Sequence, residues 1–298
     1  MTNRYILFQA YGNQQILAEC RFALMQLLQH NDPNDICLVL YTDNPGYFTK
    51  ELKAFDNNII EMVTPALITA WRGKIDFVHR VKVEILQHFF SSHSGSVLYC
   101  DTDTYCLQPI SGLFRQIENG AVYMHSNEGL IGKSNNTVIK KWKRFLTTKN
   151  STINGKPVAG INGIAMWNAG VIGLHSNKAY LLKEVLNITD SIYPVFAKHT
   201  VEQFAFSYVL QKNGLISPAD NFIFHYWDLK EYRVLLNKFY EINKGKSLQE
   251  LAIKIQSLLP GPIMNDKLAY KKLPLFKKLF TKKWDINSCS ASLLNTGT

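Results

Sequence analysis

Two aspartates separated by one residue, Asp101 and Asp103, are the strongest candidates for chemistry in this sequence. They follow four apolar residues, 97–100, which predict a short buried strand. Because side chains alternate between the two faces of an extended chain, both carboxylates point to one side of the strand end. Neighbouring carboxylates stay ionised at low cost only beside a cation, and hard oxygen ligands suit Mn²⁺ or Mg²⁺. The spacing therefore predicts a divalent-metal site, with a solvated turn as the alternative.

Two basic residues and one amide elsewhere in the chain could serve such a site. Arg80 and Lys82 lie on a predicted helix, where residues two positions apart diverge by about 200°, so they cannot share a face. The one that reaches the site would bind a diphosphate or hold an aspartate; the alternative is a structural ion pair and a solvated lysine. Asn168 stands beside Ala169 and Gly170, so its amide either meets a polar ligand that approaches closely or satisfies a buried turn.

A helix start and an aromatic segment supply the remaining candidates. Glu202, with Gln203 beside it, falls in the first turn of a predicted helix and is a candidate general base. A carboxylate is also favoured at that position by the helix dipole alone. His225 and Lys230 flank a pair of aromatic residues and are candidates for a third metal ligand and a phosphate ligand, with a packed core histidine as the alternative.

Three functions compete for these residues. In haloacid-dehalogenase-like phosphotransferases the first aspartate of a similar motif is a nucleophile, which here would be Asp101. In sugar transfer from nucleotide-sugars, an aspartate pair holds a metal on the departing diphosphate. A non-catalytic nucleotide-sugar-binding protein would need neither Glu202 nor His225. Tyr105 and the lack of a second acidic pair later in the sequence disfavour the phosphotransferase.

The elements that must position these residues alternate along the chain. Hydrophobic patterns predict strands over 5–10, 35–42, 58–63, 97–100, 164–175 and 222–227, and helices over 13–30, 76–90 and 201–212. This order predicts an α/β fold with a mostly parallel central sheet and helices on both faces. Sites in such sheets lie beyond the carboxyl ends of the strands, where Asp101 and Asp103 fall.

Composition sets the class of protein and its organisation. The 298 residues are 46% hydrophobic and 19% charged, which is typical of a globular protein. After Asp228 the pattern changes to short helices, so we predict a catalytic domain over 1–228 and a small helical, basic C-terminal extension over 229–298. No apolar run approaches the ~18 residues of a spanning helix, and the start lacks the pattern of a signal peptide. The five cysteines are scattered, so we expect reduced thiols and a cytoplasmic location. We predict no nucleic-acid partner, because much of the basicity lies in the extension.

The candidate motifs together resemble a known family. The segments that carry the likeness are Arg80-x-Lys82, 97–104 with its D-x-D motif, 167–173 with Asn-Ala-Gly, Glu202-Gln203, and His225 with Lys230. They resemble GT-A fold glycosyltransferases and are most similar to family 8, the glycogenin- and lipopolysaccharide-galactosyltransferase-like branch. The resemblance implies a UDP-sugar donor, Mn²⁺ (or Mg²⁺), and retaining transfer of a hexose to a hydroxyl of a glycan or lipid-linked acceptor, in glycan or lipopolysaccharide biosynthesis.

The resemblance also implies roles for individual residues. The metal ligands would be Asp101, Asp103 and His225. The nucleotide-sugar would contact Tyr11, Arg80, Asp101, Thr102, Asp103 and Lys230. The catalytic residues would be Asn168, Glu202 and Gln203. Tyr11 sits where an aromatic residue stacks on uracil. Glu202 stands where the family has aspartate, so inversion stays open beside retention.

The basic extension carries a pattern of its own. Its last 38 residues hold seven lysines against two aspartates. Within 266–284, apolar residues recur at three- to four-residue spacing with lysines off the stripe, and Pro274 breaks or starts the helix. This composition is typical of a helix on an anionic membrane surface, so we predict peripheral contact with the inner face of a membrane. The alternative is a stripe packed on the catalytic domain.

Overall fold

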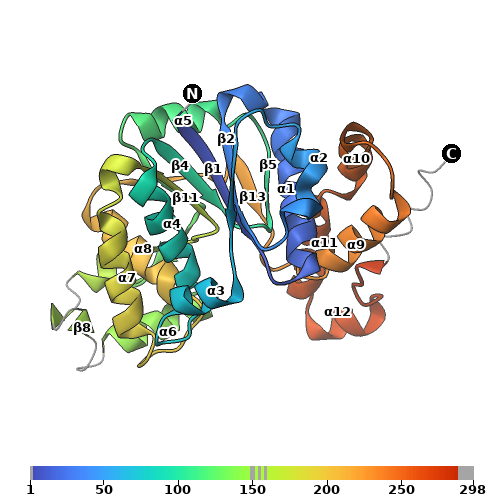
Figure 1. The fold of residues 1–298 in the computed structure, drawn as a ribbon. Helices are drawn as coiled ribbons and strands as arrows, with labels where there is room; N and C mark the ends of the chain where they lie inside the picture. Colours follow the sequence, from blue (N-terminus) through green and yellow to red (C-terminus); the bar gives the residue numbers. More distant parts are fainter. Residues whose placement is uncertain (1–2, 148–151, 154–155, 158–159, 288–298) are drawn as a thin grey trace.

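The computed structural model describes residues 3–147, 152–153, 156–157 and 160–287 (Figure 1). The strands are β1 Arg4–Ala10, β2 Cys37–Thr42, β3 Asn58–Met62, β4 Ser96–Cys100, β5 Thr104–Cys106, β6 Val122–Met124, β7 Asn127–Leu130, β8 Thr152–Ile153, β9 Lys156–Pro157, β10 Ala165–Trp167, β11 Val171–His175, β12 Ile216–Pro218 and β13 Ile223–His225. The α-helices are α1 Gln14–His30, α2 Thr49–Leu52, α3 Pro65–Arg72, α4 Arg80–Ser92, α5 Ser111–Glu118, α6 Thr137–Leu146, α7 Leu181–Ile192, α8 Val201–Lys212, α9 Tyr232–Ile242, α10 Leu248–Lys254, α11 Pro260–Lys272 and α12 Leu275–Phe280.

The largest sheet in the described residues has seven strands in the order β12-β6-β11-β4-β1-β2-β3. Neighbouring strands from β4 through β1 and β2 to β3 pair in parallel, whereas β11 runs antiparallel to both β4 and β6. The mostly parallel sheet predicted from the sequence is therefore confirmed. Its parallel block brings the carboxyl ends of β1, β2 and β4 to one edge.

Helices cover both faces of this sheet, as the alternation of side chains along β1 shows. Leu7 packs into a core with α4, α7 and α8, while Ile6 and Phe8 point the other way, into a core with α1 and α5. Figure 1 shows α4, α7 and α8 on one side of the sheet and α1 on the other. Strands buried on both faces explain the nearly continuous apolar runs in the sequence.

Two predicted elements differ from the structure. The helix predicted to begin at Asp76 begins at Arg80, because Gly73 and Asp76 adopt positive φ angles of 65° and 51° in the preceding turns. The single strand predicted over 164–175 is two strands, β10 and β11. Between them Asn168 Oδ1 accepts a hydrogen bond of 2.9 Å from the amide of Gly170, which turns the chain.

The helices of the C-terminal extension share a core with the sheet-forming part of the chain. Tyr226, Tyr232 and Leu236 pack in one cluster with Phe22 of α1 and Tyr105 of β5. Helix α9 thereby lies along α1, as Figure 1 also shows. This packing matters for the site, because it places the start of the extension beside the carboxyl ends of the strands.

Within the described residues, no helix combines the length and the apolar character needed to cross a membrane. The described cysteines, Cys20, Cys37, Cys100 and Cys106, are buried free thiols, as the sequence predicts for reduced cysteines. Cys289 lies outside the described residues.

Candidate functional site

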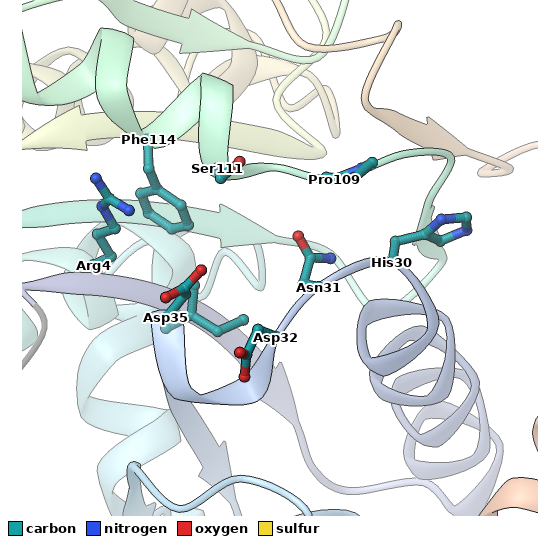
Figure 2. A pocket seen from close by; sticks show the side chains of 9 residues that line it. Arg4, His30, Asn31, Asp32, Asp35, Pro109, Ser111 and Phe114 are labelled. Atoms are coloured by element: carbon teal, nitrogen blue, oxygen red, sulfur yellow. The ribbon is translucent and has the colours of Figure 1, made fainter.

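Among the hollows formed by the described residues, two lie at opposite ends of the sheet. The smaller, about 120 Å³, is at the amino ends of the strands beside Arg4 and Phe114 (Figure 2). Arg4 is engaged there in an ion pair of 2.6 Å with Glu118, and none of the sequence candidates lines the hollow. The larger is a cleft of about 730 Å³ that contains both aspartates of the D-x-D motif. The chemistry is therefore expected in the cleft.

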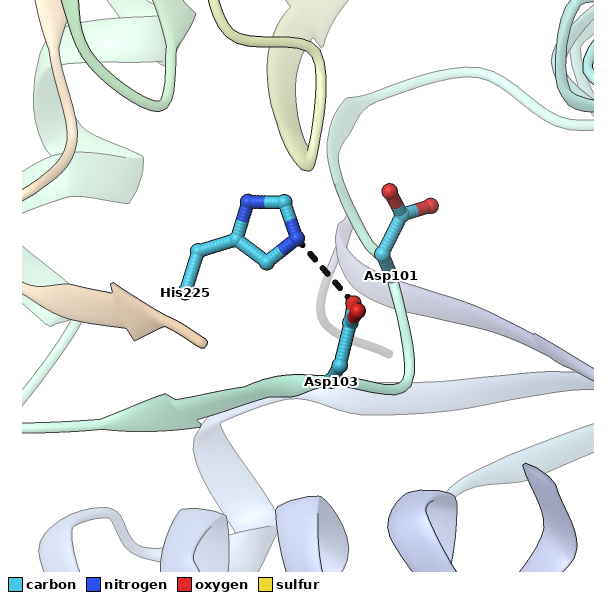
Figure 3. A group of neighbouring side chains, drawn as sticks. All are labelled: Asp101, Asp103 and His225. Carbon is cyan, nitrogen blue, oxygen red and sulfur yellow. Dashed lines mark hydrogen bonds and ion pairs between the residues drawn. The ribbon is translucent and has the colours of Figure 1, made fainter. Parts of the chain in front are cut away.

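Strand pairing brings the three predicted metal ligands together in this cleft. Asp101 follows β4 directly, and Asp103 precedes β5, which pairs with β13 so that Thr104 lies opposite His225. Ligand atoms of Asp101, Asp103 and His225 lie within 4.8 Å of one another. Figure 3 shows the His225 ring facing Asp103, with Asp101 one turn of chain away.

The orientation of His225 is fixed from both sides of its ring. Its Nδ1 lies 2.9 Å from Asn168 Oδ1, an acceptor, so Nδ1 carries a proton. Its Nε2 lies 3.0 Å from Asp103 Oδ1. Burial works to lower the pKa of His225, but the Asp103 carboxylate outweighs it and raises that pKa, which favours the protonated ring between its two partners.

Gly170 provides the space that the His225 ring needs. A Cβ atom added at Gly170 would lie 2.2 Å from Nδ1 and from Cε1 of the ring, far closer than side chains approach one another. The backbone of Gly170 also accepts a 2.8 Å hydrogen bond from the amide of Asp101, because β11 starts where β4 ends. The glycine noted in the sequence therefore sits between the aspartate motif and the histidine.

A second histidine supports the first without competing for a metal. His125 contacts His225 edge-to-face, with ring centroids 5.2 Å apart, and its Nε2 lies 3.1 Å from the carbonyl oxygen of Ile223. Burial lowers the pKa of His125 to about 4, so this ring is neutral and donates its Nε2 hydrogen to the carbonyl. His125 was not recognised as a candidate from the sequence.

Of the two predicted cations, Lys82 is the one that reaches the cleft. Its Nζ donates hydrogen bonds to Asp101 Oδ2 at 3.1 Å and to the carbonyl oxygen of Ala169 at 2.8 Å. Burial works to lower the pKa of Lys82, but Asp101 and Glu202 outweigh it and raise that pKa. Lys82 therefore remains charged and offsets part of the negative charge of the aspartates.

Arg80 points away from the cleft. Its Nε and one terminal nitrogen bind the carboxylate of Asp190 at 2.7 and 3.1 Å, and the other terminal nitrogen donates to Glu84 and to the carbonyl of Trp71, each at 2.6 Å. These contacts connect α4 to α7 and occupy the guanidinium. Arg80 therefore forms a structural ion pair, which was the alternative to a role in the site.

Glu202 is a buried carboxylate that faces the cleft. Its Oε1 lies 3.9 Å from Lys82 Nζ and 3.9 Å from His79 Nδ1, while its Oε2 has no hydrogen-bond partner among the described residues. A buried polar atom without a partner is costly, so its position calls for an explanation. A substrate hydroxyl bound in the cleft would supply the missing partner.

The amide wall of the cleft consists of Glu128, Asn168 and Gln203, which are joined by hydrogen bonds. Asn168 Nδ2 donates to Glu128 Oε1 at 3.2 Å, and Gln203 Nε2 donates to Glu128 Oε2 at 2.9 Å. Glu128 lies on β7 and carries no motif around it, so sequence reasoning missed it. The amides of Asn168 and Gln203 are thereby held in fixed orientations.

The basic wall of the cleft consists of Lys230, Arg233 and Lys267, all from the C-terminal extension. Arg233 forms an ion pair of 2.9 Å with Glu19, a residue of α1 that is 1% exposed. Burial raises the pKa of Glu19 to about 7, even though Arg233 acts in the opposite direction. Lys267 is bound by the carboxylate of Glu231 at 2.7 Å. Of these three, only Lys230 was predicted.

Besides Arg80, two further predicted ligand residues, Tyr11 and Thr102, lie outside the described lining of the cleft. Tyr11 is half-buried after β1, and burial raises its pKa to about 12, with smaller contributions from Asp101 and Asp43. Thr102 is buried between the two aspartates. Asp43 occupies the end of β2, where its Oδ2 accepts a 2.8 Å hydrogen bond from the amide of Gly12.

The residues of the triad fit a divalent metal. Asp101 and Asp103 offer carboxylate oxygens, and His225 would offer Nε2, because Asn168 holds the proton on the other ring nitrogen. The Nε2 proton that now bridges to Asp103 is the one that a metal would replace. Hard oxygen donors with one imidazole suit Mn²⁺ or Mg²⁺.

No protein-family model matches the sequence, and no curated protein sequence does either. Solved structures of glycosyltransferases resemble its fold at low identity. The apo structure of the bifunctional glycosyltransferase WbbM has a TM-score of 0.50 at 12% identity, over 79% of this chain and 44% of that one. The glycosyltransferase GlyE of Streptococcus pneumoniae TIGR4 has a TM-score of 0.50 at 12% identity, over 86% and 64%.

The galactosyltransferase LgtC, solved with donor and acceptor sugar analogues, gives a TM-score of 0.49 at 11% identity, over 72% of this chain and 73% of that one. The chain spans less than half of WbbM and under two thirds of GlyE. At these identities the likeness shows the fold alone. The fold is that of GT-A glycosyltransferases, as the sequence predicted.

Proposed function

We propose that this chain is a metal-dependent glycosyltransferase that moves a hexose from a nucleotide-sugar, a UDP-sugar, to a hydroxyl of a glycan or lipid-linked acceptor. The observation that carries the proposal is the convergence of Asp101, Asp103 and His225 in a 730 Å³ cleft at the carboxyl ends of the strands. The GT-A fold supports it.

The two walls of the cleft suit the two halves of a nucleotide-sugar. Carboxylate and amide groups of the amide wall match the hydroxyl groups of a sugar, which donate and accept hydrogen bonds. Cations of the basic wall match a diphosphate, for which the planar guanidinium of Arg233 is well suited. A divalent ion bound by the triad would neutralise charge that develops on the departing diphosphate.

The residues of this chain then position the reaction. Lys82 holds Asp101 in place through a hydrogen bond, and Asn168 holds His225 and Glu128 in fixed orientations. Glu202 presents an unpaired oxygen to the cleft, where it either accepts a proton from the acceptor hydroxyl or stabilises positive charge at the anomeric carbon. The first role gives inversion, and the second accompanies retention, which the family resemblance favours.

The alternatives use the same residues differently. A phosphotransferase would use Asp101 as its nucleophile, but it would leave the pair of Asp103 and His225, 3.0 Å apart, without a role. A non-catalytic nucleotide-sugar-binding protein would not need a buried carboxylate without a partner at Glu202. These contacts favour sugar transfer over both.

The function is tested by incubating the protein with UDP-, GDP- and CMP-sugars, with and without Mn²⁺, and measuring release of the nucleotide. We expect slow release from at least one UDP-sugar in the presence of Mn²⁺ only, because water can replace the acceptor. Binding of a nucleotide-sugar without any release, with or without an acceptor mixture, would instead identify a binding protein. Phosphatase activity that depends on Asp101 would identify the phosphotransferase.

The role of Glu202 is tested by the stereochemistry of the first product, observed by NMR. If transfer inverts, Glu202→Gln should lower the rate by about 10²–10⁴, the range for loss of a general base. If transfer retains, the product anomer matches the donor and Glu202 is not the base. Glu241→Gln, the same change at an exposed residue of α9 outside the cleft lining, is the control for altered charge.

A further inference from the structure

Helix α12 displays an apolar face to solvent. Leu275, Phe276, Leu279 and Phe280 are 84%, 62%, 83% and 89% exposed, and the helix has no buried residue in the described structure. At 100° per residue these four side chains cover one continuous side of the helix. Two leucines and two phenylalanines exposed together on six residues differ from singly scattered surface apolar residues, which need no explanation.

The chain is anchored on both sides of this helix. Before it, Ile263 is buried in the core of the C-terminal helices, and Lys267 binds Glu231. After it, Ile286 is buried in that same core, against which Trp284 packs. The exposed face therefore belongs to a segment whose two ends are held in place. Among the described residues of the predicted stripe, Phe276 and Phe280 are exposed, whereas Trp284 packs on the core that the C-terminal helices share with α1.

Lysines precede, interrupt and follow the apolar residues of α12 along the chain. Lys272, Lys277, Lys282 and Lys283 are exposed and form no ion pair within the described residues. Lys278 donates a 2.8 Å hydrogen bond to the carbonyl of Lys271, which ties α12 to the end of α11. The surface thus combines large apolar side chains with positive charge that is not neutralised locally.

We propose that α12 docks on an anionic membrane surface, with Leu275, Phe276, Leu279 and Phe280 in the lipid interface and the flanking lysines on the headgroups. Apolar residues opposite basic ones are the composition of helices that lie in a membrane interface. Uncompensated lysines favour an anionic lipid surface over a second copy of this chain, whose own lysines would be repelled. Each lysine near such a surface strengthens binding about fivefold.

Docking would also orient the cleft. Helix α12 lies directly below α11 in Figure 1, and Lys267 of α11 lines the cleft. A membrane that receives α12 would thus lie beside the wall of the cleft to which α11 contributes. This step rests on the proposed function: it makes the acceptor a lipid-borne sugar or hydroxyl.

The test is co-sedimentation of the full chain with vesicles of phosphatidylcholine alone or mixed with phosphatidylglycerol, at low and high salt. Because no donor or acceptor is added, lipid binding is measured independently of the proposed function. We expect sedimentation with the mixed vesicles at low salt and loss of binding as salt screens the lysines. Neutral vesicles should sediment little protein.

Three variants locate the surface. The double change Leu279→Ser and Phe280→Ser should weaken vesicle binding by about 100-fold, about tenfold for each large apolar side chain. Changing Lys277, Lys282 and Lys283 to Gln should weaken it by about fivefold for each charge. Leu215→Ser, at a residue that is 92% exposed but distant in sequence, is the matched control and should leave binding unchanged. The lysine variant decides the question if the double variant does not fold.

Two outcomes would overturn the proposal. Equal sedimentation of the parent chain and of the variants would show that α12 is not the docking surface. A dimer in size-exclusion chromatography that the double change converts to a monomer, without lipid binding, would show that the apolar face receives a second copy instead.

Discussion

The amide wall and the basic wall of the cleft are built differently. In the amide wall, Asn168 and Gln203 are buried and both donate to Glu128, and Asn168 also holds His225. In the basic wall, Lys230 is exposed, and Arg233 rests on the buried Glu19. One wall is a connected hydrogen-bond network, whereas the other presents charged side chains from the C-terminal extension.

This difference indicates that the two walls of the cleft have different functions. Networks of buried hydrogen bonds fix the orientation of side chains, which positioning a sugar and a metal ligand requires. Point charges at the rim tolerate small shifts and attract an anion over a longer range. We therefore expect changes in the connected part of the site to reduce the rate of transfer, and changes in the basic wall to reduce donor affinity.

The largest effect is expected at the metal site that both walls adjoin. Asp103→Asn keeps the size of the side chain but removes its charge, so the rate of Mn²⁺-dependent transfer should fall by about 10³-fold. The measurement is the initial rate at saturating donor over a range of Mn²⁺ concentrations. A rate within a few-fold of that of the parent protein would show that Asp103 holds no catalytic metal.

The next largest effect is expected at Gly170, which belongs to the same connected region. Gly170→Ala places a methyl group against the His225 ring and should weaken Mn²⁺ binding by about 10- to 100-fold, as loss of an orienting contact does. Calorimetry with Mn²⁺ in the presence of UDP measures this. Gly163→Ala is the control, since a Cβ there meets nothing within 4 Å. Equal Mn²⁺ affinity in both variants would contradict the role of Gly170.

A pH effect on stability is expected from Glu19 beneath the basic wall. Its pKa rises from an ordinary 4.5 to about 7 on folding, so the folded state holds the proton more tightly. Stability from this group is complete below pH 4.5 and is lost as pH rises through 7, by about 2 kcal/mol between pH 5 and 8. Glu19→Gln should remove this loss in urea unfolding at the two pH values. An identical pH dependence in both proteins would refute it.

The smallest effect is expected from Arg233→Lys in the basic wall. Lysine keeps the charge but lacks the fork that matches two phosphate oxygens, so UDP should bind about fivefold more weakly while the rate at saturating donor changes little. Arg4→Lys, in an ion pair at the opposite end of the sheet, is the matched control. A large fall in the rate of transfer at unchanged UDP affinity would contradict the proposal that the basic wall contributes to donor affinity rather than to the rate.

The sequence predicted the parts of this site that depend on local pattern. The apolar run predicted a strand that ends at Asp101, and the structure places β4 immediately before it. Residues 101–103 form a turn rather than the extended chain that the alternation argument assumed, and the pairing of β5 with β13 brings Asp103 to His225. The helix over 201–212 was predicted with its observed bounds, although Thr200, which precedes it, makes no side-chain capping hydrogen bond. The hydrophobic periods of strands and helices, together with the turn residues between them, were sufficient to predict the mostly parallel sheet.

Contacts between distant elements could not be predicted in this way. The sequence reduced the site cation to Arg80 or Lys82, but the rotation of α4 is set by its packing against Asp190 of α7. Glu128 enters the cleft because β7 pairs with β10, a pairing without a local signal. Glu19, by contrast, did have a local signal in the sequence. It is a charged residue within the buried, largely apolar stretch of α1, and a buried charge requires a partner.

The most direct test of the account is calorimetric titration of UDP into the parent protein and into Asp103→Asn, with and without Mn²⁺. We predict that UDP binds the parent protein tightly only when Mn²⁺ is present, and that the variant shows the weak, metal-independent affinity of the basic wall alone. Equal affinity for UDP in all four titrations would contradict the central claim that Asp101, Asp103 and His225 form a metal site for a nucleotide diphosphate.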